Sequence, residues 1–320
     1  MSDSNFLHRL DGGTGNVRIA VVGCGGAGCN AIGSLGINAG GVARTIAVNT
    51  DAAHLLTVQA GKKLLIGRNI TAGRGAGGNA ETGRSAAEEA RKTVREELSG
   101  TDMVFVIAGM GGGTGSGASS VIASAAREAG AMPISIVTMP FSFERGRRER
   151  AKDYLRELVH VSESTVILEN QKIIELYPEQ NVYSAFGLMN TLISDLVLNL
   201  SSTLVKPSLI NVSYGDFRSV MRTGKTSTLI FNENSDIDVL VRGAVTKPFF
   251  QNTIKAAKGA LIHVSGGSAM TLGRMHRIIA EAQEALGGCS NVILGARDDG
   301  RKNDILSLTA VVTGLEQAIS

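Results

Sequence analysis

Two glycine-rich segments, each placed directly after a short apolar run, constrain the fold of this chain more than any other feature. Residues 23–28 (GCGGAG) follow the apolar run 17–22, and residues 109–117 (GMGGGTGSG) follow the apolar run 103–108. Each segment precedes a predicted helix. A strand, a glycine turn and a helix in this order form the unit of α/β sheets that binds phosphate groups at a helix N-terminus. We therefore expect an α/β protein with two such turns at adjacent strand ends.

The order of the other predicted elements supports this fold class. Strands alternate with helices over the first half of the chain. The predicted strands are 17–22, 45–48, 103–108, 134–138 and 165–168, and the predicted helices begin near 26 and span 83–98, 116–129 and 144–159. This alternation predicts a Rossmann-like, doubly wound and mostly parallel sheet.

A long helix and a second α/β region follow. Apolar residues recur at helical spacing from 183 to 205, which predicts a central helix buried over much of its surface. Later apolar runs predict a smaller C-terminal α/β domain; they lie at 226–231, 261–264, 292–295 and 305–313. The predicted division is a flexible N-terminal arm at 1–15, a nucleotide-binding domain at 16–182, the central helix at 183–205 and a second domain at 206–320.

Composition excludes several classes of protein. A net charge of +3 over 320 residues is small for a nucleic-acid-binding protein, and three cysteines are too few for a disulfide framework. No apolar run reaches membrane-spanning length, and the first residues lack a signal-peptide core. We therefore expect a cytoplasmic protein that neither binds nucleic acid nor inserts into a membrane.

Taken alone, the first glycine segment predicts a dinucleotide site. Residues 23–28 satisfy the pattern G-x-G-x-x-G, and Asn49, Thr50 and Asp51 follow the next strand at about the position of a ribose-binding acid. An NAD-dependent oxidoreductase is therefore one interpretation. The plainer alternative is that these glycines only let a helix pack closely on a strand.

The second glycine segment indicates a different ligand. Its nearly bare backbone can direct several N–H groups at phosphate oxygens, and the hydroxyls of Thr114 and Ser116 can add donors. A third glycine-rich loop at 73–79 (GRGAGGN) can close over a terminal phosphate. The P-loop pattern G-x-x-x-x-G-K-[ST] does not occur in the sequence. These features predict a nucleoside triphosphate held from two sides by backbone donors and a metal ion.

Residues 111–117 (GGGTGSG) match the tubulin signature GGGTG[ST]G, and around them the chain closely resembles the FtsZ/tubulin family. The resemblance covers residues 17–315, and the stretch 259–264 (GALIHV) resembles archaeal members in particular. It implies a cytoplasmic GTPase that forms filaments and acts in cell division. It also implies that the domain at 16–182 binds GTP and that the domain at 206–320 is an activation domain.

The resemblance assigns residues in four loops to the phosphate groups. These residues are Gly25, Gly26 and Asn30 in the first loop, Asn49 and Asp51 in the second, Ala76, Gly77, Gly78 and Asn79 in the third, and Gly112, Gly113, Thr114, Gly115, Ser116 and Gly117 in the signature loop. The third loop would sense the γ-phosphate.

At the sugar and the base, the resemblance implies five further contacts. Glu144 would bind the ribose hydroxyls, and Arg148 would lie near the ribose and phosphate. Phe186 would stack on the base, while Asn170 and Asn190 would contact guanine. The acceptor oxygens of these amides suit guanine and would be left unpaired by adenine, which predicts GTP over ATP. Without the resemblance, the plainer interpretations are a core residue for Phe186 and a surface or capping residue for Asn190.

Residues 209–217 (LINVSYGDF) resemble the family's catalytic loop, typically NxDFADV, which completes the nucleotide site of the next subunit in a filament. Asn211 and Asp216 match that pattern, whereas Ser213 stands where the family usually has Asp. The resemblance therefore implies Asp216 and Asn211 as the catalytic residues. Because positioned carboxylates orient the attacking water, Ser213 in place of an Asp predicts slow hydrolysis. The alternative is a structural filament that binds GTP and hydrolyses little of it.

The implied ligands are GTP or GDP with Mg²⁺ on the phosphates, and the implied main partner is a further copy of the chain in a head-to-tail homopolymer. No side chains are expected to form a metal site of their own. Family members generally continue through a flexible linker to a peptide that binds membrane anchors, whereas this sequence stops at Ser320. Contact with membrane-anchor or division proteins, and recruitment to the division site, are expectations that rest on the resemblance alone.

Overall fold

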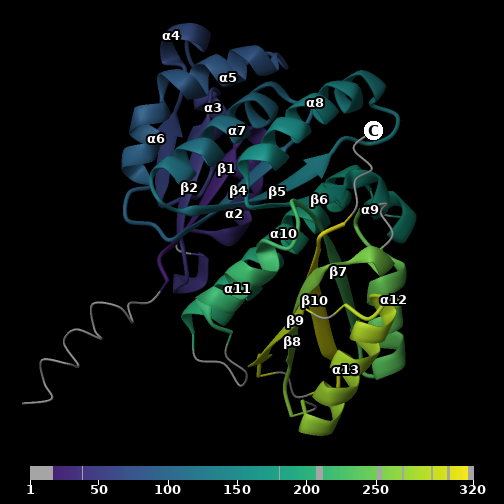
Figure 1. The fold of residues 1–320 in the computed structure, drawn as a ribbon. Coiled ribbons are helices and arrows are strands. Elements are labelled where there is room, and N and C mark those ends of the chain that lie inside the picture. The colour runs from purple at the N-terminus through teal and green to yellow at the C-terminus, as the bar shows by residue number, and fades with distance from the viewer. Residues whose placement is uncertain are drawn as a thin grey trace, which may run out of the picture.

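The computed structural model describes residues 17–37, 39–179, 181–206, 212–250, 254–268, 270–289, 291–300 and 303–315. The predicted N-terminal arm, residues 1–15, lies outside the described residues. In the described part, ten strands form one sheet in the order β3-β2-β1-β4-β5-β6-β7-β10-β8-β9, with helices on both faces (Figure 1).

The first half of the sheet is parallel, as predicted. Its strands are β1 (Ile19–Cys24), β2 (Arg44–Asn49), β3 (Lys62–Leu65), β4 (Met103–Gly109), β5 (Met132–Met139) and β6 (Ser164–Glu169). Strands β1, β4, β5 and β6 are buried almost throughout, as expected for a parallel sheet covered on both faces. All neighbouring pairs from β3 to β6 are parallel, so the carboxyl ends of these strands share one edge.

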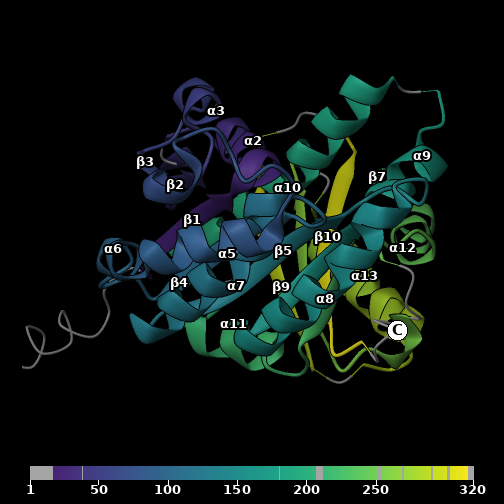
Figure 2. The same ribbon diagram turned by 90° about the horizontal axis from the view of Figure 1, so that it is seen from above.

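Helices cover both faces of this half. They are α2 (Gly25–Leu35), α3 (Ala52–Thr57), α4 (Arg68–Thr71), α5 (Ala80–Glu89), α6 (Arg91–Glu97), α7 (Gly113–Glu128), α8 (Arg145–Val161) and α9 (Asn170–Leu176), with a 3₁₀ turn η1 (Ala39–Gly41). Alternate residues of β1 enter two separate cores: Val22 packs with α5, α7 and α8, and Val21 packs with α2 and the long helix α10 (Val182–Val205). Figure 2 shows α5, α7 and α8 as one layer.

The second half continues the same sheet. It contains α11 (Tyr214–Met221), β7 (Thr226–Asn234), α12 (Ile237–Thr246), η2 (Ile254–Ala256), β8 (Gly259–Gly266), α13 (Leu272–Ala285), β9 (Asn291–Asp298) and β10 (Leu306–Thr313). Strand β7 joins β6 in parallel over only three residue pairs, and β10 runs antiparallel to both β7 and β8. The second α/β region is therefore joined to the first by strand pairing; the predicted domain limits stay a prediction.

Helix α10 lies between the two halves (Figure 1). Its buried residues, such as Met189, Leu196 and Leu200, pack with α2 and with strands of both halves. By length and composition alone, Ser184–Val205 could cross a membrane, so the expectation that no apolar run is long enough is wrong for this segment. Half of the most apolar stretch of this segment is buried inside the protein. Packing against the cores of both halves therefore accounts for its apolar composition.

Two predicted helices differ from the structure. The helix expected at 83–98 is two helices, because Ala90 leaves helical geometry with φ −92° and ψ −1°. The helix expected from 116 begins at Gly113, so much of the signature segment is helix rather than loop. The first residues of this helix are glycines and other small residues, so the sequence there shows no helical spacing of apolar side chains.

Candidate functional site

A cavity of about 510 Å³ opens at the carboxyl ends of β1, β2, β4 and β5. Fourteen of the residues predicted to bind the nucleotide line it. They are Gly26, Asn30, Asn49, Asp51, Ala76, Gly78, Gly112, Gly113, Thr114, Gly115, Glu144, Asn170, Phe186 and Asn190. Segments up to 160 residues apart in the sequence, from 26–30 to 186–190, therefore meet in one hollow.

Two helix N-termini meet at this cavity. Helices α2 and α7 begin after Cys24 and Gly112, and in neither does a side chain cap the first turn or an acidic residue occupy it. The first N–H groups of both helices are therefore available to an anion, which the helix dipoles also favour. Gly25 has φ +70°, and a Cβ there would lie 2.7 Å from the backbone nitrogen of Gly115, so only glycine lets the two turns approach.

The signature residues divide into two groups. Gly112, Gly113, Thr114 and Gly115 line the cavity. The hydroxyl of Ser116 instead accepts a hydrogen bond from the Gly111 N–H at 2.8 Å and is buried. Gly117 packs against the backbone of α5, where any side chain would overlap the carbonyl oxygen of Ala80. The second group shapes the turn and packs it on α5.

The third loop also divides. Ala76 and Gly78 line the cavity together with Gly75, whereas Gly77 and Asn79 do not. The Asn79 side chain accepts hydrogen bonds from the N–H groups of Glu81 and Thr82, at 2.9 and 3.2 Å, and so caps α5.

The second loop brings in a residue that sequence reasoning missed. Asp51 caps α3 by accepting a hydrogen bond from the His54 N–H at 3.0 Å. The imidazole of His54 lines the cavity between the side chains of Asn49 and Asn30, at 3.2 and 3.0 Å. The only signal available in the sequence was a histidine one helical turn after the Asn-Thr-Asp motif.

Amide and aromatic side chains occupy the end of the cavity near α9 and α10. Phe186 is 45% exposed and packs edge-on against Phe141, with ring centroids 5.6 Å apart. It is therefore not the core residue that helical spacing alone suggests. Asn170 and Asn190 line the same end, with Met189 and Ile193 from α10.

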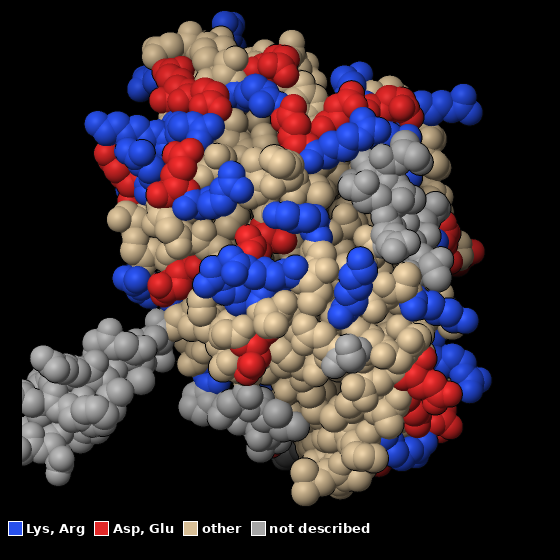
Figure 3. Space-filling view, in the orientation of Figure 1, with Lys and Arg blue, Asp and Glu red and all other residues tan. Residues whose placement is uncertain are grey.

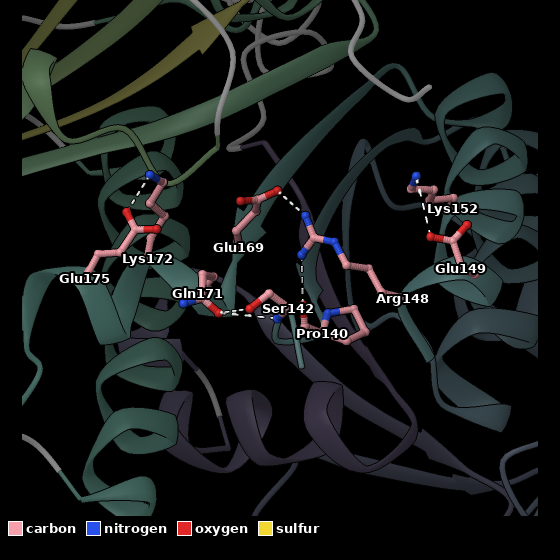
Figure 4. Close-up of polar contacts among 9 residues, drawn as sticks. All are labelled: Pro140, Ser142, Arg148, Glu149, Lys152, Glu169, Gln171, Lys172 and Glu175. Atoms are coloured by element: carbon pink, nitrogen blue, oxygen red, sulfur yellow. Dashed lines mark hydrogen bonds and ion pairs between the residues drawn. The ribbon is translucent and has the colours of Figure 1, made fainter. Parts of the chain in front are cut away.

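The two neighbouring arginines of α8 have different surroundings. Arg148 donates to Oε1 of buried Glu169 at 2.9 Å and to the Pro140 carbonyl at 3.1 Å, so its guanidinium turns toward β6 (Figure 4). Arg148 does not line the cavity, but Arg147 does. Arg147 pairs with Glu144 and donates to the carbonyl of Gly111 at 3.4 Å. One step along a helix turns a side chain by about 100°, which places Arg147 rather than Arg148 at the cavity wall; the contact of Arg148 with ribose and phosphate that the resemblance implies stays a prediction.

The predicted catalytic residues lie elsewhere. Asp216 is exposed in the first turn of α11 and does not line the cavity, and Asn211 lies outside the described residues. Ser213 is the N-cap of α11.

Two helix N-termini facing one end of a deep cavity, with amides and an aromatic ring at the other, suit a nucleotide with several phosphates. The parallel sheet and this site define a nucleotide-binding α/β protein of the tubulin-like class. Residues 18–178 match the family model of the GTPase domain of the Tubulin/FtsZ family, and residues 218–316 match that of the FtsZ C-terminal domain.

Comparison with known relatives indicates the same family. The chain is 39% identical to cell division protein FtsZ 2 of Methanocaldococcus jannaschii, covering 99% of this chain and 85% of that protein. It is 36% identical to cell division protein FtsZ 2 of Haloferax volcanii, covering 98% and 79%. The solved FtsZ dimer of M. jannaschii matches with a TM-score of 0.88 and 34% identity over 98% of this chain and 93% of that one. CetZ2 of H. volcanii shares the fold, with a TM-score of 0.78, 19% identity and 94% of both chains covered.

This chain belongs to the tubulin/FtsZ family. It is a GTPase of the kind that acts in cell division, and it binds guanine nucleotide. The dinucleotide interpretation of the first glycine segment is therefore wrong: the chain belongs to a GTPase family, and six residues of the second segment line the same cavity beside three of the first.

Proposed function

We propose that this chain binds GTP with Mg²⁺ and hydrolyses it in a head-to-tail homopolymer, where each site is completed by the next copy. One observation carries the proposal: the cavity and Asp216 lie at opposite edges of the sheet. The hydroxyl of Tyr214 donates to the carbonyl of Asp102 at 3.0 Å, just before β4 begins, whereas the cavity opens at Gly109, where β4 ends. Seven strand residues span about 20 Å, so Asp216 cannot reach the cavity of its own chain.

Contact between two different surfaces of one chain is heterologous and builds an open filament. The edge with the cavity and the edge with α11 are such a pair. A solved structure of a relative is described as an FtsZ dimer, and one of CetZ2 as a protofilament bound to GTPγS. Both relatives support self-association as the proposed mode of action.

Each end of the cavity suits one part of GTP. The N–H groups at the starts of α2 and α7, with Gly26 and Gly112–Gly115 beside them, would hold the phosphates. Phe186 would stack on the base, and Asn170 and Asn190 would offer it acceptors and donors. We assign the ribose to Glu144, with Arg147 rather than Arg148 beside it.

The chemistry of the cavity also fits Mg²⁺ carried on the phosphates. No group of three His, Cys, Asp or Glu side chains gathers anywhere among the described residues. Mg²⁺ typically keeps several waters and uses substrate phosphates with one or two carboxylates, so it needs no such group. When bound, the ion would neutralise charge that develops on the phosphates.

In this arrangement Asp216 of one copy acts on the nucleotide of the next. Its carboxylate would orient and polarise the attacking water, with Asn211 as the second predicted group.

The decisive measurement is phosphate release from GTP with Mg²⁺ over a range of protein concentrations. Specific activity that rises above a threshold concentration supports a site completed by a neighbour. Equal specific activity at all concentrations would contradict it, because a site complete in one chain needs no partner.

The second candidate is a filament that binds GTP but hydrolyses it barely, which the serine at position 213 favours. It predicts near-zero phosphate release although sedimentation detects polymer.

In either case, contact with membrane-anchor or division proteins at the division site stays a prediction. Lys, Arg, Asp and Glu are interspersed on the face shown in Figure 3, which offers no extended basic surface for nucleic acid.

A further inference from the structure

Three side chains beside the cavity form a hydrogen-bonded row that the proposed function leaves without a role. Asn49 ends β2, His54 lies on α3 and Asn30 lies on α2. All three line the cavity. Asn30 and Asn49 are predicted nucleotide contacts, whereas nothing so far assigns a task to His54.

The orientation of the Asn49 amide is fixed by the backbone. Its Oδ1 accepts hydrogen bonds from the N–H groups of Thr50 at 2.9 Å and Asp51 at 3.3 Å. Its Nδ2 therefore faces Nδ1 of His54, at 3.2 Å. Because an amide nitrogen only donates, Nδ1 of His54 must accept and carries no hydrogen.

The tautomer of His54 follows from this contact. A neutral imidazole without a hydrogen on Nδ1 carries it on Nε2, which lies 3.0 Å from Oδ1 of Asn30. This Nε2–H donates to that oxygen. The Asn30 oxygen is then occupied, which leaves its two amide hydrogens for an acceptor in the cavity.

We propose that His54 is a positioning residue of the nucleotide site: its neutral Nε2–H tautomer links the two asparagines and presents the amide hydrogens of Asn30 to the nucleotide. The proposal rests on the proposed function, in which Asn30 and Asn49 contact the nucleotide. It differs from a role as an imidazolium that contacts a phosphate directly, because an imidazolium has two donors and no acceptor. Protonation would break the link to Asn49 and release the row.

The charged and titratable groups on the elements around the imidazole make no recorded hydrogen bond to the ring itself. They are Cys29 on α2, Arg44 on β2, Asp51 before α3, Lys62 and Lys63 on β3, and Arg74 in the third loop. The Cys29 thiol donates to backbone carbonyls, Lys62 pairs with Glu97, and Lys63 donates to the Leu56 carbonyl. Arg44 donates to Thr101 at the other end of β2, and Arg74 meets Asp51 by a backbone bridge. Among the recorded hydrogen bonds of the imidazole, both partners are asparagines.

The test compares His54→Gln with His54→Ala in the full chain, with His276→Ala as control on the exposed face of α13. Glutamine offers one acceptor and one donor and so can preserve the row, but it does not titrate. Affinity for a fluorescent GTP analogue is measured below the assembly threshold at about pH 8, where the neutral imidazole predominates in ordinary histidine. Circular dichroism melting checks that each variant folds.

We expect His54→Ala to weaken nucleotide binding about three- to tenfold at pH 8, the size of one lost hydrogen-bond link, and His54→Gln to stay within about twofold of the parent. Equal losses in both variants would overturn the positioning role. A folded parent without measurable affinity for GTP would contradict the proposed function itself.

Discussion

The hydroxyl of Ser213 donates a hydrogen bond to Oδ2 of Asp216 at 2.6 Å and accepts one from the backbone N–H of Asp216 at 3.1 Å. Ser213 is thereby the N-cap of α11, and Asp216 lies in its first turn, where the helix dipole favours a carboxylate. An aspartate at position 213 could also cap the helix, but it would put a second negative charge beside Asp216. In this chain the serine holds the proposed catalytic carboxylate without repelling it.

Replacing Ser213 by alanine should destabilise the protein and slow hydrolysis together. Loss of the cap costs about 1 kcal/mol, which lowers the melting temperature by about 1–2 °C in a chain of this size. Because Asp216 loses its hydroxyl partner, phosphate release should fall several-fold, whereas Ser213→Thr should retain both properties. The measurements are thermal melting and phosphate release above the assembly threshold. A Ser213→Ala variant with the parent's turnover would separate the cap from catalysis.

Removal of the Asp216 carboxylate should abolish most turnover and leave nucleotide affinity intact. The predicted loss for Asp216→Ala is about 100-fold in phosphate release, typical for a general base or water-positioning group. Affinity for GTP at low protein concentration should be unchanged, because Asp216 does not line the cavity. Asp153→Ala, an exposed change on α8, is the matched control. Unaltered turnover in Asp216→Ala would sink the catalytic assignment.

Two glycines of the signature should respond to alanine in opposite ways. At Gly112 the backbone has φ −89° and a Cβ would meet nothing within 4 Å, so Gly112→Ala should fold normally but weaken GTP binding about tenfold, since the methyl group enters the phosphate end of the cavity. At Gly117 a Cβ would overlap the α5 backbone, so Gly117→Ala should cost about 3 kcal/mol. Urea unfolding and nucleotide titration of both variants test this contrast; similar stability of the two would contradict it.

Sequence patterns predicted the parallel half of the fold well, because buried parallel strands are continuous apolar runs and glycine turns mark their ends. They could not predict that β7 would extend the same sheet, since strand partners far apart in sequence leave no local periodicity. Fourteen predicted residues line the cavity because motif spacing fixes backbone position. Which side chain faces the ligand depends on tertiary partners. The guanidinium of Arg148 binds the Glu169 carboxylate instead of lining the cavity. The imidazole of His54 meets Asn30 only because α2 and α3 pack side by side in the fold.

The two arginines of α8 should therefore differ when each is replaced. Arg148→Ala leaves the Glu169 carboxylate, which is 4% exposed, without its partner and should destabilise the fold by about 3 kcal/mol. Arg147→Ala should change stability by less than about 0.5 kcal/mol, because that side chain is half exposed, but weaken GTP binding several-fold. The urea midpoint and the nucleotide affinity of each variant show which arginine stabilises the fold and which contacts the nucleotide. If Arg148→Ala costs more affinity than Arg147→Ala, the contact that the family resemblance implies for Arg148 is the correct one.

Acid should destabilise the second half of the sheet through His263. This side chain on β8 is 2% exposed, and its Nδ1 has no hydrogen-bond partner among the described residues. Burial together with Arg297 lowers the pKa of His263 to about 4. An unfolded histidine has a pKa of about 6.5, so the unfolded chain binds the extra proton first as pH falls. The neutral histidine's contribution to stability is complete above pH 6.5, falls by about 2 kcal/mol at pH 5 and is lost as pH passes through 4. The free energy of unfolding in urea at pH 7.5 and pH 5 should therefore drop more for the parent than for His263→Gln, by about that amount. His276→Gln, which changes an exposed histidine, should behave as the parent does, and an equal drop in all three proteins would assign the acid sensitivity to other groups.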